Sequence, residues 1–224
     1  MADIYREIEE GLRHDRLQKV WRRLRWPLLA ALLAIIGAVV AYVVVRDLAE
    51  ERQLEQGAQY AMALETFQSG NPSSAVELFS SLADDADEPG YVIFSRLRAA
   101  QASVAAGDTQ GAVNIYDRMA GDGGIDPLYR DLATLLAADR LVDTASLEEI
   151  NQRLAPLLTT ENPWRPLAQE IVALTALRVG RPEEARALFL ELSTGAGVPP
   201  GVRARSEQLL SSLGGSPVEP ATAD

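Results

Sequence analysis

Three segments of the chain repeat one pattern of glycine, alanine and aromatic residue at fixed spacing. They read SGNPSSAVELF (residues 69–79), AGDTQGAVNIY (106–116) and VGRPEEARALF (179–189). In each, an alanine follows the glycine by five residues, an aromatic residue follows that alanine by four, and another alanine precedes the glycine by seven. A glycine can end a helix in the left-handed conformation. Proline, asparagine and aspartate after it suit the start of a second helix. The pattern therefore predicts repeated helix-turn-helix pairs.

The spacing of the pattern indicates a fourth, degenerate copy. Its glycines, Gly70, Gly107 and Gly180, lie 37 and 73 residues apart, and the second spacing is close to twice the first. The missing copy falls near Asp143, where Ala137 is in place but the glycine and the second alanine are not. One helix pair cannot bury its own apolar face, so the pairs must stack. We expect an all-α solenoid of about four helix pairs, with helices over residues 46–69, 72–83, 90–106, 109–120, 127–141, 146–158, 164–179, 182–193 and 199–213.

An uncharged run, WPLLAALLAIIGAVVAYVVV (residues 26–45), precedes the repeats. A helix of about 20 apolar residues spans the hydrocarbon of a bilayer, roughly 30 Å. The run does not end in the small residues of a cleavage site, so we expect an uncleaved anchor. Residues 1–25 carry seven basic and five acidic residues, and an excess of basic residues marks the cytoplasmic side. The predicted segments are a basic amphipathic cytoplasmic helix (1–25), a transmembrane anchor (26–45), an exported helical domain (46–213) and a disordered tail (214–224).

One face of the predicted anchor consists of small residues. Such faces let membrane helices approach one another closely. Alanine is also common in membrane helices without any specific contact. The candidate positions for a helix contact inside the bilayer are Ala30, Ala34, Gly37, Ala38 and Ala41.

The charge and composition of residues 46–224 narrow the function. This segment has fourteen arginines and twenty-seven acidic residues, a net charge of −13, which disfavours nucleic acid and favours cationic partners. The chain has no cysteine, and its one histidine, His14, precedes the anchor. Catalysis by a cysteine or histidine in the exported domain is therefore excluded. We expect no enzyme activity, no cofactor, no metal site and no small-molecule substrate.

The repeat resembles the tetratricopeptide repeat, in which a small residue, a second alanine twelve positions later and an aromatic residue four beyond it recur with a closing proline. The resemblance is carried by Ala63/Ala75/Phe79, Ala100/Ala112/Tyr116 and Ala173/Ala185/Phe189. In such arrays the first helix of each pair lines a concave face that binds polypeptide. The family positions that imply this groove here are Tyr60, Leu64, Phe67, Phe94, Leu97, Gln101, Leu167, Glu170 and Leu174. Some of these side chains could instead serve packing between helices.

The layout of the whole chain is similar to the family of the ancillary subunit of the bacterial Sec translocon. The shared features are the segment DIYREIEE…LQKVWRRL, a single anchor and an acidic array of degenerate helix pairs. The resemblance implies a single-pass inner-membrane protein with a periplasmic domain, whose partners are translocon subunits, periplasmic chaperones or exported polypeptides. The alternative is a scaffold for envelope assembly or cell division that binds one folded partner. A signalling role for the cytoplasmic helix is a third possibility.

Overall fold

A computed structural model describes residues 2–214, with side chains for residues 25–27, 29, 30 and 32–214. Residues 2–214 contain helices and no strand. The chain divides into two compact units, residues 1–55 and 56–224. The helices are α1 (Ala2–Gln68), α2 (Pro72–Asp85), α3 (Pro89–Ala105), α4 (Thr109–Ala120), α5 (Pro127–Leu141), α6 (Leu147–Leu154), the short 3₁₀ helix η1 (Ala155–Leu157), α7 (Arg165–Arg178), α8 (Pro182–Thr194) and α9 (Pro200–Ser212).

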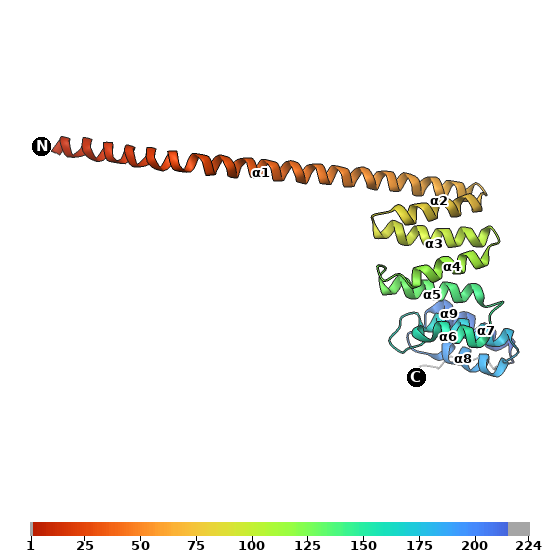
Figure 1. The fold of residues 1–224 in the computed structure, drawn as a ribbon. Coiled ribbons are helices and arrows are strands. Elements are labelled where there is room, and N and C mark those ends of the chain that lie inside the picture. Colours follow the sequence, from red (N-terminus) through yellow and green to blue (C-terminus); the bar gives the residue numbers. More distant parts are fainter. Residues whose placement is uncertain (1, 215–224) are drawn as a thin grey trace. The chain divides into compact units, whose positions relative to one another are not determined.

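The helices of the second unit follow one another as antiparallel pairs in a solenoid-type arrangement (Figure 1). Most predicted helix ends lie within one or two residues of the observed ones. The second helix of the third pair differs. It was expected over residues 146–158, but α6 ends at Leu154 and the chain continues as the 3₁₀ helix η1. Pro156 lies in η1 and has no N–H to donate, which explains why the α-helix stops there.

The three repeated glycines end their helices in the predicted way. Gly70, Gly107 and Gly180 have φ of +81°, +84° and +77°. After α1, the N–H of Asn71 donates to the carbonyl of Thr66 (3.2 Å) and that of Gly70 to the carbonyl of Phe67 (3.1 Å). This pair of bonds is the Schellman motif. The same pair recurs after α3 and after α7.

The two polar residues expected to cap the following helices behave differently. The carboxylate of Asp108 accepts a hydrogen bond from the N–H of Gly111 (2.8 Å), so it caps α4. Asn71 makes no side-chain cap on α2, and there the prediction is wrong. The backbone of the two residues is similar, with φ of −109° at Asn71 and −94° at Asp108. The difference lies in the residue that would donate: a Cβ added at Gly111 would clash with the Asp108 carboxylate, and the equivalent residue of α2, Ser74, has a Cβ.

The predicted alanine and aromatic positions form the centre of the fold. Both alanines of each pair are fully buried, as are Phe79 and Phe189, and Tyr116 is nearly so. The buried residues form two clusters. We call them the N-terminal core, which runs from Ala63 to Ala137, and the C-terminal core, which runs from Leu135 to Leu210. Helix α5 belongs to both: Ala133 and Ala137 face the first, whereas Leu135 and Ala138 face the second.

Polar contacts hold the irregular third pair against its neighbours. Ser146 caps α6 by accepting from the N–H of Glu149 (3.2 Å). The turn before it is held by Arg178, which donates to the carbonyl of Ala145. Toward the start of α7, the Asn162 amide donates to Asp131 (2.8 Å). Further contacts join Trp164 to the carbonyl of Leu128 and Arg153 to Asp117.

The first unit consists of helix α1 up to Glu55. Among the described residues, one helical stretch, Arg25–Gln68, is long and apolar enough to cross a membrane by its length and composition alone. The predicted amphipathic helix over residues 1–25 is part of α1 from residue 2 onward, but the side chains of residues 1–24 lie outside the described residues. The predicted disordered tail lies outside them from residue 215 onward.

Candidate functional site

A hollow of about 370 Å³ opens between α5, α7 and α9. Five of the side chains that line it are aliphatic and three are charged. Helices α5 and α7 are the first helices of the third and fourth pairs, and α9 is the closing helix. We call this site the α5–α7–α9 hollow, and its lining residues are Leu135, Leu136, Asp139, Leu167, Glu170, Ile171, Leu174 and Arg205.

A bidentate ion pair forms part of the wall. Arg205 donates from Nε and Nη2 to the two carboxylate oxygens of Glu170, at 2.7 and 2.8 Å. Glu170 is only 6% exposed, so its charge requires a partner. The hydrogen bonds to Glu170 raise the pKa of the Arg205 guanidinium, which stays charged. The pair therefore removes most of the charge of Glu170 from the surface of the hollow.

A second carboxylate lies at the edge of the hollow. Asp139 contacts the guanidinium of its neighbour Arg140, and the side chain of Asp139 is 40% exposed. Both groups also act on Tyr116, which belongs to the N-terminal core. Burial raises the pKa of the Tyr116 phenol, Arg140 opposes that rise and Asp139 adds to it. Asp139 is thus an accessible acid at the boundary between the two cores.

The structure brings three of the nine predicted groove residues together. Leu167, Glu170 and Leu174 all line the α5–α7–α9 hollow. The other six lie on α1 and α3. Of these, Phe94 is 52% exposed, and Gln101 is exposed and accepts a hydrogen bond from Arg98 (2.7 Å). The remaining four, Tyr60, Leu64, Phe67 and Leu97, pack against the N-terminal core.

Sequence reasoning missed the contribution of α5 and α9 to this hollow. Counted from Ala137, the family positions would select Asp131, Thr134 and Ala138, whereas Leu135, Leu136 and Asp139 line the hollow. The lining residues of α5 are the ones that face α7, and a repeat pattern without a glycine gives no reliable register there. Arg205 lies in a closing helix outside the repeats. The sequence offered one indication of this contact. Glu170 is an acid within a largely apolar helical stretch, and a buried acid requires a cation nearby.

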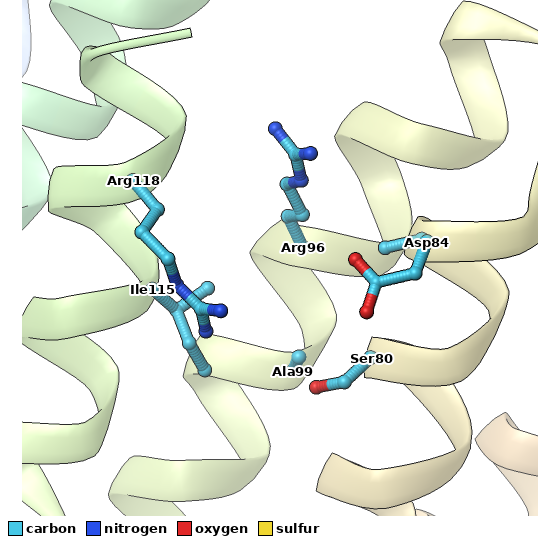
Figure 2. Close-up of a pocket in the computed structure, with 7 residues that line it drawn as sticks. Ser80, Asp84, Arg96, Ala99, Ile115 and Arg118 are labelled. Carbon is cyan, nitrogen blue, oxygen red and sulfur yellow. The ribbon is translucent and has the colours of Figure 1, made fainter.

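A second, smaller depression of about 60 Å³ lies between α2, α3 and α4. Figure 2 shows Asp84 and Ser80 of α2 on one side of it and Arg118 of α4 on the other. Arg96 also lines it and is engaged elsewhere, with Nη1 donating to Asp122 (2.6 Å). This hydrogen bond, followed by one from the N–H of Gly124, lowers the pKa of Asp122. The depression has room for little more than ordered water.

The small residues of the predicted membrane contact are all exposed on α1. These positions are Ala30, Ala34, Gly37, Ala38 and Ala41. A Cβ added at Gly37 would meet no atom within 4 Å. The face is therefore accessible, and what it contacts stays a prediction.

Antiparallel helix pairs, left-handed glycines between them and buried alanines where they cross define an α-helical repeat protein. The family described as a tetratricopeptide repeat-like domain matches residues 18–193. Because this match covers well over half of the chain, the protein belongs to that family. No curated protein and no solved structure matches it. The family fold is generally a non-enzymatic protein-interaction fold. Among residues 25–214 with described side chains, no group of three or more potential ligands is arranged to hold a metal ion.

Proposed function

We propose that this protein is a membrane-anchored interaction module that binds polypeptide segments in the α5–α7–α9 hollow. The observation that carries the proposal is the composition of the hollow. Five aliphatic side chains line about 370 Å³ of open space, and the one deeply buried acid is neutralised by Arg205. Such a surface favours apolar side chains of a partner, because burying them removes apolar area from water.

The anchor in this proposal is the apolar part of α1, over residues 26–45. Its support is the uncharged sequence of the right length and the basic residues before it. The orientation that follows is a single pass through the bacterial inner membrane, with residues 1–25 in the cytoplasm and the helical array in the periplasm. The exposed small residues around Gly37 would then contact a helix of a membrane partner.

Within this class, we favour an accessory role at the Sec translocon, in which the array helps to pass exported polypeptides to periplasmic folding factors. The support is the layout resemblance together with the net charge of −13 on residues 46–224. An acidic array attracts cationic polypeptides and increases their rate of encounter. A role of this kind requires no bound cofactor and no nucleic acid.

Site-specific photocrosslinking in membranes tests the proposal. We expect a photoreactive residue at Leu174 in the hollow to trap exported polypeptides caught before folding. Leu190, which lies on α8 and is 50% exposed, provides the matched control position. Equal crosslinking at Leu174 and Leu190 would contradict the assignment of polypeptide binding to the hollow. If only folded envelope proteins are trapped, the scaffold alternative replaces the translocon role.

Topology has its own test. An enzyme reporter that is active only outside the cytoplasm, fused to the C-terminus, should be active in cells. Activity of a cytosol-specific reporter at the same position would contradict the orientation.

A further inference from the structure

We infer that the α5–α7–α9 hollow selects polypeptide segments in which a few aliphatic or aromatic side chains are followed by lysine or arginine, and that Asp139 recognises the cation. The inference rests on the proposed function, since it names the chemistry of the segment that the hollow takes. It adds a charge preference that an apolar surface alone would not have.

The size of the hollow limits what enters it. Sites that enclose small molecules have volumes of roughly 300–1,000 Å³, and this one has about 370 Å³. A volume at the lower end of that range holds a few side chains but not a whole helix. The aliphatic walls come from α5 and α7, with Leu135 and Leu136 on one side and Leu167, Ile171 and Leu174 on the other. The occupant is therefore a short apolar anchor within a longer segment.

The charges at the hollow favour a basic residue beside that anchor. Three charged groups line it, one from each helix: Asp139 of α5, Glu170 of α7 and Arg205 of α9. Arg205 has both Nε and Nη2 occupied by Glu170, so these two charges largely cancel. The remaining charge is the carboxylate of Asp139. A basic segment can pair with this carboxylate. An acidic segment would be repelled by it and would find Arg205 already engaged by Glu170.

Arg140, the present partner of Asp139, can be displaced. Both side chains are about two-fifths exposed, and exposed ion pairs contribute little because water already solvates the two charges. Arg140 contacts Oδ2 of Asp139, and a carboxylate can accept further hydrogen bonds on its two oxygens, so a lysine or arginine that an apolar anchor holds beside Asp139 can also pair with it. The acidic charge of the whole array acts in the same direction by drawing basic segments toward the surface.

The test measures the binding of three matched fluorescent peptides to the full chain in lipid nanodiscs. One peptide has a Leu-Leu anchor followed by two lysines, the second replaces the lysines by glutamates, and the third keeps the lysines but replaces the leucines by serines. We expect the lysine peptide to bind about two- to fivefold more tightly than the glutamate peptide, as one exposed charge pair allows. The difference should shrink as salt is raised. The serine peptide should bind far more weakly than either.

Three variants test whether Asp139 causes the preference for the lysine peptide. Asp139→Asn should remove most of the difference between lysine and glutamate peptides, whereas Arg140→Gln should enlarge it by freeing the carboxylate. Glu77→Gln, at an exposed position on α2, changes the net charge by the same amount as Asp139→Asn and should leave the difference intact. Helical circular dichroism checks that each variant is folded. Opposite responses of Asp139→Asn and Arg140→Gln cannot arise from a common loss of structure.

The outcomes separate the inference from the proposed function. If the leucine peptides bind in the hollow with no preference for lysine, or if Asp139→Asn and Glu77→Gln behave alike, the charge selection is wrong and the polypeptide site remains. If the leucine peptides bind no better than the serine peptide, or if Leu174→Ser leaves their binding unchanged, the hollow is not a polypeptide site and both statements fail.

Discussion

The regular and the irregular helix pairs of the array are held by different kinds of contact. In the N-terminal core, the turns follow a local code: glycines with positive φ at Gly70 and Gly107, and an alanine and an aromatic residue at fixed positions after each. The third pair, which begins the C-terminal core, has no such glycine and depends on contacts with distant residues such as Arg178 and Asn162. A helix pair can therefore lack the glycine–alanine–aromatic pattern and still stack in the array when neighbouring helices supply the missing contacts.

The comparison also shows where a hollow can open in the array. The regular pairs fill their own crossing points with alanine and aromatic side chains, and Tyr60, Leu64, Phe67 and Leu97 pack against that core. At the irregular pair, α5 instead turns Leu135, Leu136 and Asp139 toward α7 and leaves the hollow open. Departure from the repeat is thus associated with the site.

Removing the aromatic residue of either core should have the largest effect. Phe79→Ala and Phe189→Ala each leave a cavity at a fully buried position, and such changes cost about 3–5 kcal/mol in the free energy of unfolding. Hydrogen exchange of the full chain in detergent should show which region opens. We expect Phe79→Ala to expose α2 to α4 first and Phe189→Ala to expose α7 to α9. Uniform loss of protection in both variants would mean that the two cores unfold as one.

Substitutions at the glycine turns should have the next largest effect on the free energy of unfolding. Gly107→Ala and Gly180→Ala place a Cβ in the left-handed conformation, which costs roughly 1–2 kcal/mol. Asp143→Gly is the matched change at the irregular turn. No residue there has a positive φ, so added glycine brings no stabilisation and increases the entropy of the unfolded chain. Thermal unfolding distinguishes the cases, and a stabilising effect of Asp143→Gly would show that the third turn follows the same code after all.

Substitutions at the two N-cap positions should change the free energy of unfolding by smaller amounts. Asp108→Ala removes a side-chain cap and should lower the free energy of unfolding by about 1 kcal/mol. Asn71→Ala removes no cap and should change it by a few tenths at most. Denaturant titration at neutral pH compares the two directly. Equal losses would contradict the difference in capping between the two turns.

The smallest effect should come from the ion pair of Arg96 and Asp122. Because the pKa of Asp122 is lower in the folded state than its ordinary value of 3.8, the pair stabilises the fold above that pH. The stabilisation is lost as the pH falls through the folded pKa. We expect Asp122→Asn to reduce stability by less than about 1 kcal/mol at neutral pH, with the difference vanishing in strong acid. If the difference in stability between Asp122→Asn and the unsubstituted protein did not change with pH, the effect would come from packing and not from the ion pair.

The sequence predicted most of the fold because its signals are local. Gly70, Gly107 and Gly180 determine where three helices end, and the alanines twelve residues apart determine where helices cross. The end of α6 was misplaced because Pro156 was read as part of a helix rather than as its end. The lining of the α5–α7–α9 hollow was predicted only in part for a different reason. Leu136 and Arg205 meet Leu167 and Glu170 through tertiary packing, and no spacing along the chain encodes that meeting.

The pairing of Glu170 with Arg205 has a consequence for the order in which the protein matures. The guanidinium lies on α9, the last described helix, so a nascent or shortened chain that stops before residue 205 contains the buried carboxylate without its counterion. In such an intermediate the buried carboxylate of Glu170 would have no counterion among mainly aliphatic side chains, which is unfavourable. The wall of the hollow is therefore completed only after α9 has been made, because this helix supplies the counterion of Glu170.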